Sequence, residues 1–197
     1  MTILCKTFYT VFFLLIIINI SIGQIRRSGH GQTYYACGAE LSPFPFFTGG
    51  YSGTLWWGAN HIRISGSVAK TSTPGFFIPA GFKNNVIRSY GLNGEYFFGQ
   101  AFKNLWAGGG AEYWQGSIDN SEDNAHGEYT NYMLTVGAGY VIKIWHGIYV
   151  NASGSVHLVV AGGKVVEVGN ATFNANTIVP DLSLKIGYHF PLARVNW

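Results

Sequence analysis

Polar and apolar residues alternate along much of this chain, and residues 178–190 show the pattern most clearly. The even-numbered positions from Ile178 to Phe190 are apolar or aromatic, whereas Asp181, Lys185 and His189 are among the odd-numbered ones. A period of two places successive side chains on opposite faces of a β-strand. One face of this segment is therefore apolar, and the other carries charges of both signs.

The same alternation occurs in seven further segments, separated by turn residues. The eight predicted strands span residues 33–41, 50–59, 62–69, 86–98, 105–118, 130–145, 148–160 and 178–190. Connections are short after the second, fourth and sixth strands and long after the third, fifth and seventh, the last being an expected loop at 161–177. An even number of strands with short turns at one end and long loops at the other is typical of outer-membrane barrels. We therefore predict an all-β fold, an eight-stranded antiparallel up-and-down transmembrane β-barrel.

Composition favours the same fold. Charged residues make up 11% of the chain, against roughly 25% in a typical soluble domain, and aromatic residues make up 16%. Many aromatic residues fall near strand ends, where rings gather at the two membrane interfaces of a barrel. The belt expected at the short-turn end comprises Trp56, Trp57, Tyr96, Phe97, Phe98, Phe102, Trp106, Trp145 and Tyr149.

The first 23 residues have the features of a secretory signal peptide. Lys6 gives a positive start, an apolar segment follows, and Ser21-Ile22-Gly23 places small residues where a signal peptidase cleaves. The apolar segment is shorter than the roughly 20 residues that span a bilayer, which favours cleavage over an uncleaved anchor. We predict a signal peptide at 1–23, a flexible tail at 24–32, a barrel domain at 33–197, and export to the cell outer membrane.

From residue 33 to 190, this strand pattern resembles the small eight-stranded bacterial outer-membrane barrels, the OmpA/OmpX/OmpW-like group. Members of that group end in a strand with a terminal aromatic residue that the barrel-insertion machinery reads, and Gly187-Tyr188-His189-Phe190 is similar to that element. Seven residues follow Phe190, however, and Trp197 has the opposite parity, so either aromatic residue could be the signal. The resemblance implies a monomer whose partners are outer-membrane lipids and the insertion machinery.

The polar faces of the predicted strands would line the lumen. An eight-stranded barrel has an interior just wide enough for side chains, and isolated charges there are costly to desolvate, so acids and bases should pair. Arg63 and Glu95 lie on neighbouring strands near the short-turn end. This arrangement is consistent with either a salt-bridged core that closes the lumen or a narrow water-filled pore. The candidate lumen residues are Glu40, Arg63, Glu95, Glu112, Lys143, His157, Asp181 and Lys185.

The pattern gives little indication of catalysis or of bound cofactors. His157 shares its strand face with Ser155, but positions two apart on one face are roughly 6 to 7 Å apart, which is too far for direct activation of a nucleophile. The polar run at 119–124 has Asn124 where a calcium loop of the EF-hand type needs glycine. We predict no catalytic residues, no metal and no cofactor. Basic residues are scattered and the net charge is only +3, so nucleic acid is not an expected partner.

The sequence therefore predicts a non-enzymatic outer-membrane barrel with a structural, surface-interaction or small-solute passage role. The long loops could bind an extracellular ligand. Two alternatives stay open: an outer-membrane lipid-modifying enzyme that uses a His and a Ser at the rim, and a soluble secreted β-barrel that binds an apolar ligand in its interior.

Overall fold

A computed structural model describes residues 32–99, 101–163 and 165–196 of the chain, so the predicted signal peptide and most of the tail lie outside the described residues. All eight predicted strands are present, several of them longer than expected. The barrel strands are β1 (Gln32–Leu41), β2 (Tyr51–Ala59), β3 (Ile62–Ser72), β4 (Phe82–Phe97), β5 (Asn104–Asn120), β6 (His126–Trp145), β7 (Ile148–Gly162) and β10 (Ile178–Asn196).

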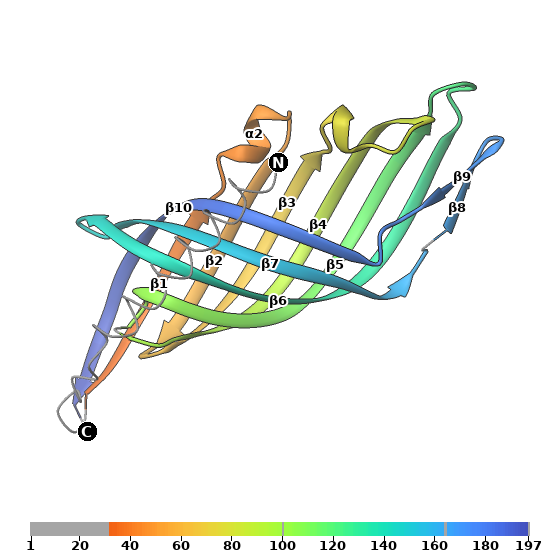
Figure 1. Ribbon diagram of the computed structural model, residues 1–197. Helices are drawn as coiled ribbons and strands as arrows, with labels where there is room; N and C mark the ends of the chain where they lie inside the picture. Colours follow the sequence, from red (N-terminus) through yellow and green to blue (C-terminus); the bar gives the residue numbers. More distant parts are fainter. Residues whose placement is uncertain (1–31, 100, 164, 197) are drawn as a thin grey trace, which may run out of the picture.

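These strands form one closed barrel in the order β1-β10-β7-β6-β5-β4-β3-β2. Every neighbouring pair is antiparallel, and β1 closes the ring by pairing with both β2 and β10. Figure 1 shows the turns β2–β3, β4–β5 and β6–β7 together at one end, and α2 (Phe44–Phe47) and the remaining loops toward the other. We call these the short-turn end and the long-loop end.

The outward-facing side chains form an apolar wall. On β3, Ile62 and Ile64 are 57% and 50% exposed, whereas Arg63 between them is 1% exposed. This reverses the burial order of a water-soluble protein, because the apolar face is turned to the surroundings and the polar face to the lumen. The predicted eight-stranded antiparallel up-and-down transmembrane β-barrel is confirmed. The same outward wall includes Leu55, Leu92, Leu134, Leu158, Leu184 and Ile186.

No helix in the described part of the chain is long and apolar enough to cross a membrane.

The last strand does not stop at Phe190. Phe190 pairs with Cys37, Pro191 pairs with Ala36, and the register then shifts by one residue so that Ala193 pairs with Tyr35. The extra residue of this bulge is Leu192, directly after Pro191, and a bulge is one of the places in a sheet that tolerate proline. The strand therefore continues past Phe190 to Asn196, where the sequence suggested a short tail or a bend. Trp197 lies outside the described residues.

The expected loop at 161–177 contains a hairpin that the sequence analysis missed. Strands β8 (Val165–Val168) and β9 (Ala171–Asn174) form a separate two-stranded sheet. Val168 and Phe173 are buried against Ile118 and Tyr129, which face inward from β5 and β6. The signal for this hairpin was the Gly169-Asn170 pair between two short β-prone runs. The hairpin gives the long-loop end a packed apolar cluster of its own.

Candidate functional site

The short-turn half of the lumen is built around one arginine. Arg63 on β3 lies directly opposite Glu95 on β4, and its Nε donates to Glu95 Oε2. Its Nη1 donates to Glu40 Oε1 at 2.7 Å, although Glu40 comes from β1, on the other side of β2. Arg63 and Glu40 are each 1% exposed. The guanidinium thus joins two carboxylates on different strands, away from water.

Aromatic rings enclose this arginine. Its Cζ lies 5.3 Å from the ring centroids of both Trp56 and Phe97. The negative faces of aromatic rings attract a guanidinium, and this attraction is strongest where water is excluded. The charge is therefore stabilised both by its carboxylate partners and by ring faces.

Hydrogen bonds extend the network across the lumen to β7. Glu40 Oε1 also accepts from Tyr149 Oη at 2.9 Å and from Asn151 Nδ2 at 3.2 Å. Tyr149 Oη in turn accepts from Trp56 Nε1 at 2.7 Å, and Asn151 Oδ1 accepts from Trp106 Nε1 at 3.0 Å. The one carboxylate of Glu40 therefore connects strands from opposite sides of the barrel.

Lys185 balances the charge of this cluster. Its Nζ lies 3.8 Å from Glu40 Oε2, an oxygen that makes no hydrogen bond in the structure. Glu40, Glu95, Arg63 and Lys185 together carry two negative and two positive formal charges. The network is thus neutral, as buried ionic groups in a narrow interior need to be. We refer to these four residues as the Arg63 network.

Phe102 closes the short-turn end below the network. It lies in the β4–β5 turn at φ 55°, and its side chain is only 3% exposed. Its ring centroid is 5.2 Å from that of Trp56 and 5.8 Å from that of Phe97. Tyr34 Oη and His189 Nε2, 2.7 Å apart, join β1 to β10 beside the ring. Packed side chains therefore fill this end of the lumen.

The aromatic belt expected at the short-turn end is accordingly wrong in part. Its members divide by strand parity: Trp57, Tyr96, Phe98 and Trp145 are exposed on the outside. The remaining members of the predicted belt are buried in the lumen, and those on strands occupy the inward positions that alternate with the outward ones. Trp56 and Tyr149 were missed as site residues for this reason, and parity was the signal that could have identified them. The lumen-facing group comprises Trp56, Phe97, Phe102, Trp106 and Tyr149.

Glycines opposite these rings make room for them. A Cβ on Gly38 would overlap the Trp56 indole, and a Cβ on Gly187 would overlap the Tyr149 ring. Both glycines lie on strands with ordinary backbone angles, so close approach is what requires the missing side chain. Part of the high glycine content of the chain therefore serves to fit large rings into a narrow barrel.

A second polar cluster lies further toward the long-loop end. His157 Nδ1 is 2.9 Å from Thr135 Oγ1 and 3.4 Å from Glu112 Oε2, and its Nε2 is 3.2 Å from Ser155 Oγ. Our expectation that Ser155 and His157 are too far apart was wrong, because it used backbone spacing and ignored side chains that lean along the strand. Trp114 Nε1 also donates to Glu112 at 2.7 Å.

Two predicted lumen residues do not join either cluster. Lys143 and Asp181 are both exposed, and neither forms an ion pair within the described ranges. Lys143 lies near the short-turn end of β6, and Asp181 lies near the long-loop end of β10. Both side chains are exposed to solvent, so neither charge needs a buried partner. The structure therefore brings together six of the eight candidates, in two separate groups.

No family model and no curated protein matches the chain. Among solved structures, it is similar to Neisserial surface protein A, with 15% identity and a TM-score of 0.42 over 85% of this chain and 100% of that one. It is also similar to a major outer membrane protein from Thermus thermophilus, with 14% identity and a TM-score of 0.45 over 82% and 100%. A third similar structure is CarO2 of Acinetobacter baumannii, with 14% identity and a TM-score of 0.41 over 81% and 98%.

Proposed function

We propose that this chain is an outer-membrane barrel with a closed lumen, and that its role is structural or lies in contacts at the cell surface. The observation that carries the proposal is the Arg63 network, in which buried charges connect strands across the lumen above the Phe102 ring. Passage of small solutes, one of the roles expected from the sequence, is disfavoured by this arrangement.

A water-filled path through this end would need the network to come apart. Separating one member of a buried ion pair leaves an uncompensated charge, at a cost of about 3 to 5 kcal/mol. The charges of Glu40 and Glu95 are balanced by Arg63 and Lys185, so the network has little electrostatic reason to attract a passing ion. The polar interior is therefore better suited to stabilising the barrel than to conducting.

A surface-contact role is supported by aromatic residues at the long-loop end. Phe47 on α2 is 86% exposed, and Phe76 and Phe77 on the 3₁₀ turn η1 (Gly75–Phe77) are 81% and 71% exposed. Figure 1 shows α2 and η1 at the same end of the barrel. Exposed rings of this kind are typical of sites that meet a membrane interface or a partner protein. An extracellular ligand, outer-membrane lipids and the insertion machinery remain the proposed partners.

Membrane insertion and closure can be tested on the same preparation. The mature protein should fractionate with outer membranes, and its gel mobility in SDS should change on boiling, because closed barrels resist SDS until heated. Vesicles that contain the folded barrel should then show no more swelling in a small sugar than empty vesicles do. Recovery in the soluble fraction would contradict the membrane assignment, and rapid swelling would contradict the closed lumen.

One observation favours a second candidate function, hydrolysis by a serine nucleophile. Ser155, His157 and Glu112 form a chain of contacts in the order that serine hydrolases use for nucleophile, base and orienting acid. They face the lumen and not the lipid, unlike the rim site expected for a lipid-modifying enzyme. Ester hydrolysis by the folded barrel that disappears in Ser155→Ala would establish this activity. Equal rates for the two proteins would exclude it and leave the cluster a structural role.

A further inference from the structure

The outer wall carries a groove between β3 and β6, at mid-height of the barrel. It is shallow, with a volume of about 480 Å³, and Gly66, Leu92 and Ala111 are among the residues that line it. These residues sit side by side on neighbouring strands, since Gly66 pairs with Leu92 and Leu92 pairs with Ala111. A second groove of about 240 Å³, between β1 and β3, shares Gly66 and Val68 with the first. Gly66 and Ala111, the small residues on either side of Leu92, create this depression in an otherwise bulky apolar wall.

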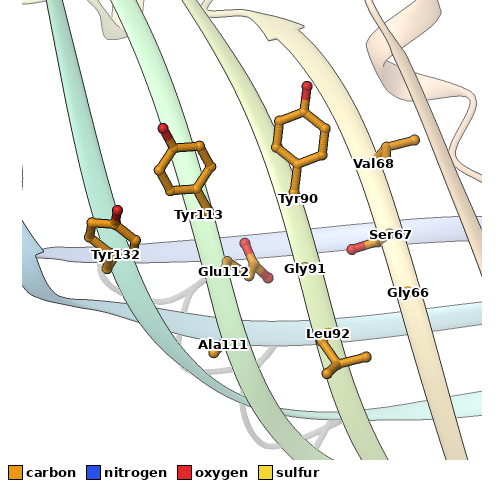
Figure 2. Close-up of a pocket in the computed structure, with 10 residues that line it drawn as sticks. All are labelled: Gly66, Ser67, Val68, Tyr90, Gly91, Leu92, Ala111, Glu112, Tyr113 and Tyr132. Atoms are coloured by element: carbon orange, nitrogen blue, oxygen red, sulfur yellow. The ribbon is translucent and has the colours of Figure 1, made fainter.

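Tyrosines border the groove on the long-loop side. Tyr90, Tyr113 and Tyr132 are direct neighbours in the strand register, with ring centroids 6.3 Å and 5.2 Å apart. Figure 2 shows the three rings side by side on adjacent strands, with their hydroxyl groups at the same end. Tyrosine in this position is typical of the level where lipid headgroups meet the hydrocarbon core. The groove below them therefore lies at acyl-chain depth.

Two cations stand directly beyond the tyrosines. Lys70 on β3 and Arg88 on β4 are opposite each other in the register, two residues from Val68 and Tyr90 and on the same outward face. Neither forms an ion pair within the described ranges. Like charges placed directly opposite on neighbouring strands destabilise a sheet. An anion bound between them would offset that repulsion.

We infer that this face binds a membrane lipid whose headgroup has a phosphate and a net negative charge, with an acyl chain in the groove above Gly66 and Ala111. The inference rests on the proposed membrane location and adds a specific lipid contact to it. Lys70 and Arg88 would bind the phosphate, and the tyrosines would lie at the junction of headgroup and chain. Lys70 and Arg88 lie four residues from Gly66 and Leu92, which is about 13 Å along the strands at 3.3 Å per residue, with Tyr90 between the two levels. The headgroup site and the acyl-chain site are thus separate and follow one line along the wall.

The test uses the folded barrel in bilayers of phosphatidylcholine with a minor fraction of phosphatidylglycerol, and native mass spectrometry to count retained lipids. Wild-type protein should retain phosphatidylglycerol in preference to phosphatidylcholine. Each cation removed, as in Lys70→Gln or Arg88→Gln, should lower that preference about fivefold. The matched control is Lys143→Gln, which removes an exposed cation from the opposite end and should leave the preference unchanged.

A second pair of variants tests the groove itself. Gly66→Leu should fill it, because a Cβ there meets nothing nearer than Gly91 O at 4.0 Å, and retention should fall. Gly94→Leu makes the same change on the same wall, where a Cβ also meets nothing, but outside the groove, and should not affect retention. A heat-sensitive gel shift in every variant confirms folding. If the double variant Lys70→Gln/Arg88→Gln retains as much phosphatidylglycerol as wild type, or if the wild-type barrel does not discriminate between the lipids, the lipid-binding inference is overturned while the proposed function stands. A wild-type chain that fails to insert would overturn it together with the proposed function.

Discussion

The two halves of the lumen use the same alternation of residues in different ways. Toward the short-turn end, the inward positions hold Arg63, Tyr149 and Phe97, all 2% exposed or less. Toward the long-loop end, Glu112 and Ser155 are only half-buried, and Asp181 is exposed. The charges of the Arg63 network are therefore held by one another away from solvent, whereas the polar groups of the second half lie closer to solvent. The polar face of a strand can thus become a packed core or a partly exposed lining, depending on the size of the side chains around it.

The largest difference between the halves should appear when Arg63 is removed. Arg63→Met leaves Glu40 and Glu95 buried without their cation, which should lower the free energy of unfolding by about 3 to 5 kcal/mol. Urea unfolding of the barrel in lipid vesicles measures this loss. Lys143→Met is the matched control, because the same change at an exposed cation should have almost no effect.

A triple variant shows whether the unpaired charge causes that loss. Arg63→Met combined with Glu40→Gln and Glu95→Gln leaves no buried carboxylate without a partner. The remaining cation, Lys185, is 26% exposed and can reach water, so most of the stability should return. If the triple variant is no more stable than Arg63→Met, packing and not charge explains the loss. A single variant within about 1 kcal/mol of wild type would contradict the account of this half.

Phe102→Ala tests the packed seal in the same half. Truncation of a buried phenylalanine commonly costs about 3 to 5 kcal/mol, and the lower end is expected here because Phe102 lies in a turn that can collapse inward. The same variant should make vesicles permeable to small ions, whereas Phe98→Ala, in the same turn but 58% exposed, should not. Unchanged permeability of Phe102→Ala would show that the Arg63 network closes the lumen without this ring.

In the long-loop half, the corresponding change should cost less. His157→Ala removes contacts to Thr135, Glu112 and Ser155, but water can reach Glu112 and Ser155, and the expected loss is about 1 kcal/mol. Unfolding under the same conditions as for Arg63→Met gives a direct comparison. A loss in the free energy of unfolding as large as that of Arg63→Met would show that the two polar clusters contribute equally to stability, and would contradict the comparison.

Strand positions and their inward or outward parity could be predicted from sequence because membrane barrels impose a strict period of two. Ile62, Arg63 and Ile64 show it plainly. The pairing of Arg63 with Glu95 also followed from strand neighbours. The participation of Tyr149 and Asn151 could not be predicted in the same way, because contacts across a lumen depend on barrel tilt and side-chain reach, which no local pattern records.

Two other differences have local causes. The bulge after Pro191 changes parity by one residue, and simple alternation cannot anticipate where a strand inserts an extra position. The β8–β9 hairpin is stabilised by packing of Val168 and Phe173 on the inner wall, so its two short strands looked like part of a loop when taken alone. In both cases tertiary contacts decided between structures that the sequence allowed.

The smallest predicted effect concerns pH at the tip of β5 and β6, beyond the apolar wall. A hydrogen bond from His126 Nδ1 to Asp119, with Glu128 nearby, raises the pKa of His126 and lowers that of Asp119. Because the pKa of His126 is raised, its contact contributes stability that is fully present below the usual histidine pKa of 6.5 and is lost as pH rises through the pKa of His126 in the folded protein. Because the pKa of Asp119 is lowered, its contact contributes stability that is present above the usual pKa of 3.8 and is lost as pH falls through the pKa of Asp119 in the folded protein. The contact should therefore be strongest between these two values.

An NMR titration of His126 measures this contact directly. Both groups are solvent-exposed, so the effect on unfolding should be hard to detect while the titration shift is visible. Asp119→Asn should bring the pKa of His126 back toward its ordinary value. A titration of wild-type His126 that matches the Asp119→Asn variant would show that the contact does not persist in solution.

Ion current through planar bilayers tests the central claim, a membrane-spanning barrel with a closed lumen. Insertion of the wild-type protein is first verified by its heat-dependent gel shift. The account predicts that inserted wild-type barrels give no steady current above that of the bare bilayer, because the Arg63 network and Phe102 fill the short-turn end. Stable unitary currents from the wild-type protein would contradict it.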